Sequence, residues 1–538
     1  MTLALSPRRR RAVTGGVMTA MFMAALEATV VSTAMPTVIG ALGGLAHYSW
    51  VFSAYLITAT VTVPVWGKLS DLYGRRPLYQ AGIALFLLGS ILSGMSRTMG
   101  QLIVFRAIQG LGAGAIVPVS MTIIADIYTL EERTRMQALF SSIWGISSIL
   151  GPVAGGFITD QLSWRWVFFI NIPFGIAAAA IIGAAMREPE REKRPVIDYS
   201  GAALLMVSVT LLMFGLIEGG GGMSRLLAPA SLALFGGAAL LFALFLQVER
   251  RAVDPIIPLS IFSNRVVSVS VVAGFLAGVG MFGAITFIPL FAQGGLGVTA
   301  TEAGSLLTPL LLSWVGLSVV GGKLLLRVGY RRTSIAGFTL LTVGFVLLAT
   351  FPASAPRAVL YLDLAVVGAG LGLSMLTLLI AVQQAVPRSD LGTATSLNQF
   401  ARSIGGAIGV AGMGVMLSSA LAAHLGQAAQ QGLIAADIAA RLAHDPSALI
   451  EPQAGAALSG TALQVLRASL TSAIHSVFWV AAAATVLALG VAFLLPGPAR
   501  ATPKREACTA EAGERMIMAE LATIDPPNEP VESVGDRS

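Results

Sequence analysis

Long apolar runs recur throughout this 538-residue chain, and they constrain its fold more than any other feature. Crossing the hydrocarbon core of a bilayer takes about 20 apolar residues in a helix, whereas a barrel strand takes about 10 residues that alternate between polar and apolar. The runs here are continuous and of helical length, so they predict an all-α integral membrane protein. Fourteen spans are expected, near residues 13–36, 49–67, 78–96, 100–124, 137–159, 166–186, 199–217, 228–248, 267–292, 302–322, 333–351, 357–385, 400–420 and 471–495.

Composition excludes several classes of protein. Charged residues make up 11% of the chain, against roughly 25% in a soluble domain, which argues against a soluble enzyme or a disordered scaffold. The net charge of +7 comes from basic residues scattered between the runs, without the aromatic-interleaved basic surface of a nucleic-acid binder. The single cysteine, Cys508, cannot form an intrachain disulfide, and the four histidines lack metal-ligand spacing. Neither a metal nor another cofactor is expected.

Lysine and arginine are distributed unevenly between alternate inter-span segments. The side that carries the N-terminus holds 26 of them and the opposite side holds 6, which predicts that both termini lie in the cytoplasm. The expected parts are a basic cytoplasmic N-terminus, a first six-helix bundle, two linking spans, a second six-helix bundle, a long external loop within that bundle and a disordered cytoplasmic tail. They cover residues 1–12, 13–186, 199–248, 267–495, 421–470 and 496–538, respectively.

A short motif occurs twice, once after the second span and once after the tenth. Residues 67–76 read GKLSDLYGRR and residues 322–332 read GKLLLRVGYRR. In each copy two glycines lie seven residues apart, a lysine follows the first glycine, and an arginine pair closes the motif. Two six-helix halves joined by spans seven and eight account for this repeat. Duplicated halves around a central cavity are typical of membrane transporters.

The first copy of the motif is a candidate cytoplasmic gate. Its glycines permit a tight turn, and the Asp71 carboxylate can accept hydrogen bonds from a facing helix N-terminus or pair with an arginine. We expect it to face the start of the thirteenth span, near Arg402, with Arg133 as a second partner. The alternative is a solvated loop whose basic residues only set the topology. The candidate gate residues are Gly67, Asp71, Gly74, Arg75, Arg76 and Arg133.

Ionisable residues within spans mark candidate functional positions, because a charge in hydrocarbon is costly. Glu27 lies midway along the first span, where apolar surroundings favour the neutral acid, so it is a candidate proton carrier that could also attract cationic molecules. Arg106 lies about five residues into the fourth span, with Gln109 near the same helix face. Asp126, near the other end of that span, is a candidate for coupling or for a network with Asp71. The alternatives are a neutral packing residue for Glu27, an arginine reaching the outer interface for Arg106 and an interfacial helix-end acid for Asp126.

The fifth span contains Gly151-Pro152-Val-Ala-Gly155-Gly156. The proline removes a backbone hydrogen bond and kinks the helix, while the glycines let a neighbouring helix approach closely. From the residues alone, this segment is a small-residue helix contact. Two further charged residues, Asp363 and Arg402, lie near the ends of spans twelve and thirteen and are interpreted as structural.

These stretches together resemble the major facilitator superfamily, and within it the fourteen-span drug:proton antiporters of the EmrB/QacA type. The loop at 67–77 is similar to the superfamily signature between helices two and three. Residues 102–112, LIVFRAIQGLG, resemble the motif whose buried arginine is associated with proton coupling. Residues 151–156 resemble the antiporter motif, and WRWVFFINIP at 164–173 is typical of the group.

The first span carries a fifth resemblance, with two departures. Its segment LEATVVSTAMP at 26–36 is similar to the first-helix motif of the group, but Glu27 stands where aspartate is usual and Ser32 where asparagine is usual. The resemblance covers nearly all of the membrane-associated chain. It implies the major facilitator fold with two additional central spans, in a cell-membrane protein that exports hydrophobic or cationic small molecules by alternating access, as a proton-coupled multidrug antiporter. The implied partners are these molecules, protons, the lipid bilayer and, in an organism with two membranes, a periplasmic adaptor protein.

Other functions stay open on the sequence. A dedicated proton-driven exporter of an endogenous antibiotic, siderophore or lipid keeps every motif. A membrane-embedded enzyme needs a nucleophile, a metal site or paired carboxylates within a span, and a sensor or scaffold needs a signalling domain; neither feature is recognisable. The sequence also contains no GxxxxGK[ST] phosphate loop, which disfavours ATP-driven export. The chain is therefore expected to be a transporter and not an enzyme.

Overall fold

The computed structural model describes residues 6–42, 48–186, 198–219, 222–296, 298, 300–352, 356–435 and 460–496. Within these residues the chain is helical and contains no strand, as the apolar runs predict. In chain order the elements are α1 (Pro7–Leu42), α2 (Tyr48–Tyr73), α3 (Arg75–Met95), α4 (Met99–Ile127), α5 (Leu130–Gln161), α6 (Trp166–Phe169), α7 (Asn171–Ala185), α8 (Tyr199–Gly219), α9 (Met223–Leu226), α10 (Pro229–Glu249), η2 (Leu259–Ser263), α11 (Arg265–Leu290), η3 (Phe291–Gly295), α12 (Ala300–Ala349), α13 (Arg357–Ala385), η4 (Arg388–Asp390), α14 (Leu391–Gln430) and α17 (Gly460–Ala492).

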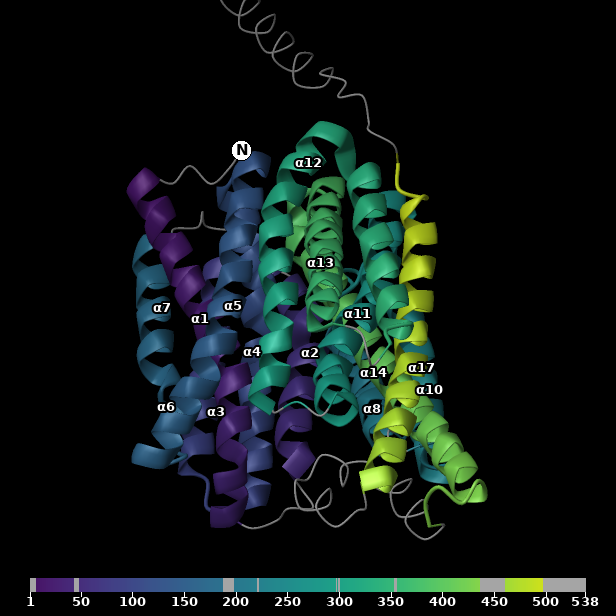
Figure 1. Ribbon diagram of the computed structural model, residues 1–538. Helices are drawn as coiled ribbons and strands as arrows, with labels where there is room; N and C mark the ends of the chain where they lie inside the picture. Colours follow the sequence, from purple (N-terminus) through teal and green to yellow (C-terminus); the bar gives the residue numbers. More distant parts are fainter. Residues whose placement is uncertain are drawn as a thin grey trace, which may run out of the picture. The chain divides into compact units, whose positions relative to one another are not determined.

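The described residues contain twelve helical segments that are long and apolar enough to cross a membrane, against the fourteen spans expected. One difference is α12, a 50-residue element that contains the expected span 302–322 and all but the last two residues of the expected span 333–351. It is not straight, because Gly329 adopts a non-helical φ of 82° and ψ of 173°, and its ribbon turns back at the upper end in Figure 1. The other difference is α5, which covers the expected span 137–159 with 32 residues but is not among the twelve.

The helices also reach further than expected into the long loop of the second half. α14 continues to Gln430 and α17 already begins at Gly460. The expected external loop 421–470 is therefore shorter by about three helical turns on each side. Residues 436–459 and the expected tail after residue 496 lie outside the described residues.

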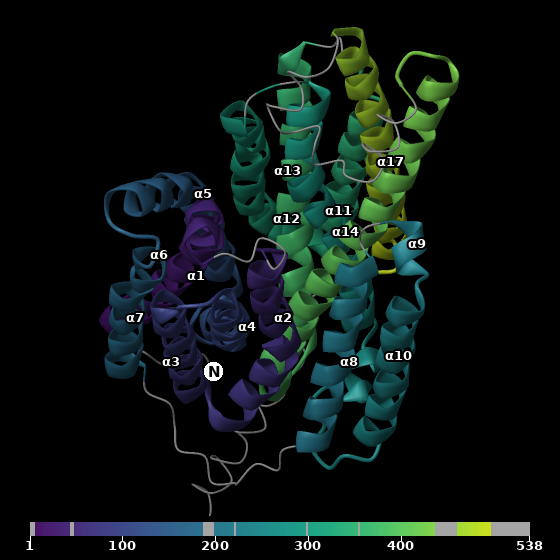
Figure 2. The ribbon, with the colours of Figure 1, turned by 90° about the horizontal axis from the view of Figure 1, so that it is seen from below.

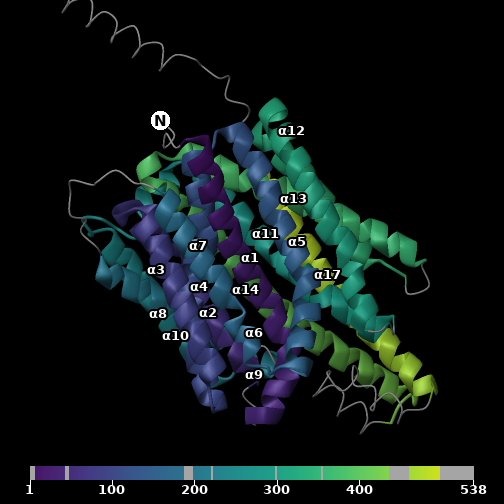
Figure 3. The same ribbon diagram turned by 90° about the vertical axis from the view of Figure 1, so that its left-hand side faces the viewer.

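Each half of the chain packs around its own apolar core. Buried residues of α1, α3, α4, α5 and α7 form one cluster, and those of α11, α12, α13, α14 and α17 form another. The halves meet where α2 packs against α14 and where α12 packs against α5. α8 and α10 pack against each other, and α8 also contacts α2 and α14 (Figure 2). Figure 3 faces the side formed by α1, α5 and α7.

The duplication indicated by the repeated motif is also seen in helix packing. α4 and α13 each carry three glycines spaced two residues apart. In α4 the outer two lie against α2 and the middle one against α3. In α13 the outer two lie against the part of α12 before Gly329, its first arm, and the middle one lies against the part after Gly329, its second arm. A Cβ atom at any of the six would lie only 2.0–2.6 Å from a neighbouring atom, so these glycines let each helix wedge between two others. They are Gly110, Gly112, Gly114, Gly368, Gly370 and Gly372.

Candidate functional site

A buried ion pair joins α1 to α4. Glu27 and Arg106 are 1% and 2% exposed, and Nη1 of Arg106 donates a hydrogen bond to Oε1 of Glu27. The same nitrogen donates to Oε1 of Gln109 at 2.8 Å, and Nε of Arg106 donates to the carbonyl oxygen of Val51 at 3.3 Å. The structure therefore brings three of the sequence-predicted coupling residues together in one place.

Further polar groups surround this pair. Asn171 begins α7 directly after the break that ends α6, and its Nδ2 donates to Oε2 of Glu27 and, at 3.0 Å, to Oγ of Ser90. The ring of Tyr55 lies under the guanidinium, with 4.2 Å between the ring centroid and Cζ of Arg106. We refer to Glu27, Ser90, Arg106, Gln109 and Asn171 as the ion-pair cluster; none of them is more than 2% exposed.

The ion-pair cluster can exist in two charge arrangements. Burying a carboxylate and a guanidinium is costly, and the pair offsets that cost because each charge is satisfied by the other. A proton on Glu27 removes this compensation and leaves Arg106 with neutral acceptors. Nε2 of Gln109 and Oδ1 of Asn171 have no hydrogen-bond partner among the described residues, so the cluster has capacity for other contacts. Gain or loss of one proton can therefore change which groups are paired.

The Gly-Pro segment of α5 packs against α1 close to this cluster. A Cβ atom at Gly151 would lie 1.9 Å from Oγ1 of Thr29, which is two residues beyond the carboxylate of the pair. The close approach of α1 and α5 here therefore depends on glycine. Of the other predicted residues in the segment, Gly155 is buried, Gly156 borders open space, and the side chain of Pro152 lies outside the described residues.

A second cluster, which we call the α2–α14 joint, connects α2 to the N-terminus of α14. Oδ1 of Asp71 accepts a hydrogen bond from the backbone N–H of Gly392 at 2.9 Å, and Oδ2 accepts from the N–H and Oγ1 of Thr393 at 2.6 and 2.8 Å. A helix N-terminus presents unpaired N–H groups and a partial positive charge, and the carboxylate satisfies both. A Cβ atom at Gly67 would lie 2.2 Å from Oγ of Ser396, so glycine is needed for this contact.

Arg75 extends the α2–α14 joint to α4. Its Nη1 lies 2.6 Å from Oδ1 of Asp71, and its Nε donates to Oδ2 of Asp126 at 3.1 Å. The sequence offered two interpretations of Asp126, coupling together with Arg106 or a network with Asp71, and the structure places it in the joint with Asp71 through Arg75. Twenty residues of helix separate Asp126 from Arg106, about 30 Å along α4, so one side chain cannot reach the other.

The partners of Asp71 also differ from those expected. The facing element is the predicted one, α14, but the contact is made by its second and third residues, about ten residues before Arg402. The charged partner described for Asp71 is Arg75, whereas Arg133 was expected. The reason is local: Gly74, with a φ of 100°, ends α2 and begins α3, which brings Arg75 back beside the carboxylate.

The two remaining arginines of the expected gate bind backbone carbonyls. Arg133 donates through Nη2 to the carbonyl of Ala125 and through Nε to that of Tyr128 at 3.1 Å. Arg76 donates through Nη2 to the carbonyl of Gly183 in α7 at 2.6 Å. Through these bonds both side chains satisfy carbonyl groups near helix ends.

The structure adds residues that the sequence did not single out. Lys68, 8% exposed, pairs with Asp254 in the segment after α10, so the repeated loop is tied to the two linking helices as well. Asn171 and Ser90 complete the ion-pair cluster. The stretch at 164–173 gave a signal for Asn171, whereas Asp254 lies in no recognisable motif.

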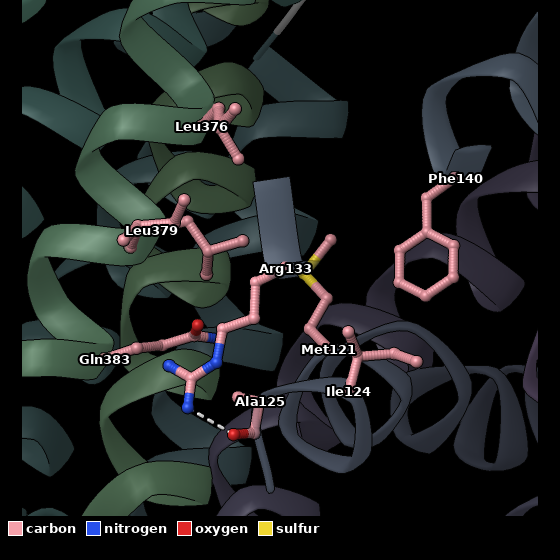
Figure 4. Close-up of a pocket in the computed structure, with 9 residues that line it drawn as sticks. Met121, Ile124, Ala125, Arg133, Phe140, Leu376, Leu379 and Gln383 are labelled. Atoms are coloured by element: carbon pink, nitrogen blue, oxygen red, sulfur yellow. Dashed lines mark hydrogen bonds between the residues drawn. The ribbon is translucent and has the colours of Figure 1, made fainter. Parts of the chain in front are cut away.

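A small apolar pocket, with room for about one water molecule, lies between the two halves near the α2–α14 joint. Figure 4 shows side chains of α13 on one side and those of α4 and α5 on the other, with Arg133 directed at the carbonyl of Ala125. The pocket brings together a hydrophobic wall and one guanidinium. Its lining residues are Met121, Ile124, Ala125, Arg133, Phe140, Leu376, Leu379, Ile380 and Gln383.

The chain is similar to known proteins over most of its length. The profile of the Major Facilitator Superfamily matches residues 17–410. The multidrug transporter protein MdtP of Bacillus subtilis (strain 168) is 36% identical over 501 residues, which cover 89% of this chain and 91% of the relative. Multidrug resistance protein 3 of the same organism is 34% identical over 487 residues, which cover 90% and 94%.

A solved structure shows the same fold at low sequence identity. It is the crystal structure of a bacterial homologue of the iron transporter ferroportin in an outward-facing state, with a TM-score of 0.59 and 12% identity, and the match covers 90% of this chain and 98% of that one. Because the profile spans most of the chain and the relatives match along nearly their whole length, this is a multi-pass membrane transporter and not an enzyme. The chain belongs to the major facilitator superfamily.

Proposed function

We propose that this protein exports hydrophobic and cationic small molecules across the cell membrane in exchange for protons. The observation that carries this proposal is the ion-pair cluster, in which a fully buried carboxylate is paired with a buried arginine inside the first bundle. An intramembrane carboxylate is a natural site for a transported proton. The names of the two Bacillus relatives, which describe multidrug transport and multidrug resistance, support the substrate class.

The proposed exchange cycle uses both clusters. A proton that reaches Glu27 from outside neutralises the carboxylate and releases Arg106 to its neutral acceptors. When the proton leaves toward the cytoplasm, the carboxylate can again attract either Arg106 or a cationic substrate, so proton and drug compete for one group. The α2–α14 joint holds the cytoplasmic side closed while the outer side is open, and alternating access requires that it break and re-form once per cycle.

The proposal includes fourteen crossings, as in the drug:proton antiporters of the EmrB/QacA type, with both termini in the cytoplasm. Counting α12 as two arms divided at Gly329 and adding α5 to the twelve candidate spans gives fourteen. An even number also agrees with the ribbon, in which the start of α1 and the end of α17 lie at the same end of the helices (Figure 1). In a Cys508→Ser background, Gln430→Cys should react with an impermeant thiol reagent from outside, and Arg8→Cys only after permeabilisation. The opposite labelling pattern would reject this topology.

Efflux from proteoliposomes under an imposed pH gradient tests the function directly. Wild-type protein should move ethidium against its gradient only when the pH gradient is present. Glu27→Gln keeps the size of the side chain but cannot release a proton, so pH-driven efflux should fall to background. Glu27→Asp keeps an ionisable group one methylene shorter and should retain part of the rate.

Two results would contradict the proposal. Ethidium efflux that does not respond to the pH gradient would remove proton coupling, and wild-type rates in Glu27→Gln between pH 6 and 8 would remove Glu27 as the coupling site. The detergent-solubilised variants should elute from size exclusion like the wild type, because loss of transport by an unfolded protein carries no information.

A further inference from the structure

Arg75, Arg106 and Arg402 lie within helices but differ in whether a carboxylate neutralises them. Arg106 pairs with Glu27, and Arg75 pairs with Asp71 and Asp126. Arg402, the twelfth residue of α14, has no carboxylate partner among the described residues. Its guanidinium donates to Oε1 of Gln399 through Nη2, and its Nη1 lies 3.6 Å from the sulfur of Met375 in α13. An arginine has five N–H donors, so this one keeps spare hydrogen-bonding capacity.

Backbone packing fixes the direction in which Arg402 points. A Cβ atom at Gly278 of α11 would lie 2.1 Å from the carbonyl oxygen of Arg402, and one at Gly405 would lie 2.0 Å from the carbonyl of Phe275, also in α11. The backbone of α14 is therefore pressed against α11 at this level, and the side chain of Arg402 extends to α13. The side chain is partly exposed, so protein atoms do not cover it completely.

Depth in the membrane makes this cation unusual. Arg402 lies about 16 Å along α14 from the charged α2–α14 joint at the start of that helix, a distance of about half the thickness of a hydrocarbon core of about 30 Å. The contact with Met375, ten residues before the end of α13, agrees with that depth. Asp363 is too distant to neutralise it, because it lies twelve residues from Met375, about 18 Å along α13. A guanidinium at this depth requires water or an anionic ligand.

We propose that Arg402 binds the anionic group of transported molecules, so that the substrate range includes amphiphilic carboxylates, sulfonates or phosphates as well as cations. A guanidinium recognises such groups through paired hydrogen bonds, and the methionine sulfur beside it offers an adaptable apolar contact for the rest of the molecule. The inference rests on the proposed export function and extends its substrate class. It replaces the structural role that the sequence indicated for Arg402.

Paired dye transport tests this assignment. Proteoliposomes with an imposed pH gradient are assayed for efflux of carboxyfluorescein, an anion, and of ethidium, a cation, with wild type, Arg402→Gln, Arg402→Lys and Arg388→Gln. Arg388 is an exposed arginine in η4, at the start of α14, and serves as the matched control for charge removal. Arg402→Gln should lower the ratio of carboxyfluorescein to ethidium efflux about tenfold or more, Arg402→Lys should lower it less, and Arg388→Gln should leave both rates unchanged.

A binding measurement separates this inference from the export function. Anisotropy of carboxyfluorescein with detergent-solubilised protein should show binding to wild type and a loss of about tenfold in affinity for Arg402→Gln. If ethidium efflux does not depend on the pH gradient but the difference in carboxyfluorescein binding is still observed, the proton-coupled export proposal is wrong and the anion site at Arg402 is supported. Equal loss of both dyes in Arg402→Gln, or wild-type protein that neither binds nor moves carboxyfluorescein, would overturn the anion site.

Discussion

The two copies of the repeated loop share a turn but differ in the residue that can hold the opposite half. In the first copy Gly74 has a φ of 100° and ψ of 158°, and in the second Gly329 has a φ of 82° and ψ of 173°. The position of Asp71 in the first copy is occupied by Leu326 in the second, which is 43% exposed. The backbone of the duplicated loop is therefore retained, while the carboxylate that caps a helix of the other half is present only once.

The helices that face these loops explain why only the first loop needs a carboxylate to cap a helix of the other half. α5, which packs against α12, caps its own N-terminus: Thr129 accepts from the N–H of Glu132, and Glu132 accepts from the N–H of Thr129. α14, which packs against α2, has Asp390 at its N-cap without a side-chain cap bond. Its first amides depend on Asp71 from the other half. The contact of α2 with α14 therefore includes hydrogen bonds that must break for these helices to separate.

The largest effect is expected from removing that carboxylate. Asp71→Asn keeps the side-chain size but loses the charge and one of the two acceptor oxygens that serve Gly392, Thr393 and Arg75. Hydrogen bonds to a charged group contribute about 1.5–3 kcal/mol each, so a conformation held by the α2–α14 joint should lose at least a factor of ten in population. Ethidium efflux in proteoliposomes should fall about tenfold or more, with normal amounts of protein in the membrane.

The second copy of the loop supplies the matched control. Leu326→Asn introduces the same side chain at the corresponding position, where no helix N-terminus depends on it, and efflux should change less than twofold. Wild-type rates in Asp71→Asn, or equal losses in both variants, would show that the carboxylate does not distinguish the two loops.

A smaller and symmetrical effect is expected at the two turn glycines. Both lie in a region of positive φ that is essentially restricted to glycine, and a side chain there costs about 1–3 kcal/mol. Gly74→Ala and Gly329→Ala should therefore lower the thermal unfolding midpoint in detergent by similar amounts. A lower unfolding midpoint in only one of the two variants would show that the two turns are not equivalent, in spite of their similar dihedral angles.

Most of the fold could be predicted because each span can be recognised from its own residues. Apolar runs of helical length identify the helices without knowledge of their neighbours. The breaks are harder to place, because Gly329 interrupts α12 with a single residue and α14 continues to Gln430, beyond the expected span 400–420, through alanine-rich sequence that favours helix. The number of separate spans therefore depends on details that apolar runs alone do not contain.

The sites could be predicted only in part, for a different reason. Glu27, Arg106 and Asp71 stand out because charge is rare in spans and because the glycine spacing around Asp71 is distinctive. Their partners do not stand out. The stretch at 164–173 points to Asn171 but not to its contact with Glu27, and the groups of α14 that bind Asp71 include the backbone amides of Gly392 and Thr393, which carry no side-chain signature. Pairing across more than 70 residues of chain is decided by tertiary packing.

The position of Asp71 at the end of α14 has a consequence for hydration. When the two helices separate, the freed amides of α14 and the freed carboxylate lie at helix ends, where water molecules can take the place of each lost protein partner. Exchange of protein for water partners leaves a net difference of only about 1 kcal/mol for a typical hydrogen bond and somewhat more for a charged one. Solvent at the helix end therefore determines how readily the contact between α2 and α14 opens. A pH difference of one unit across the membrane supplies about 1.4 kcal/mol per proton, which is comparable to the net free energy of these exchanged hydrogen bonds.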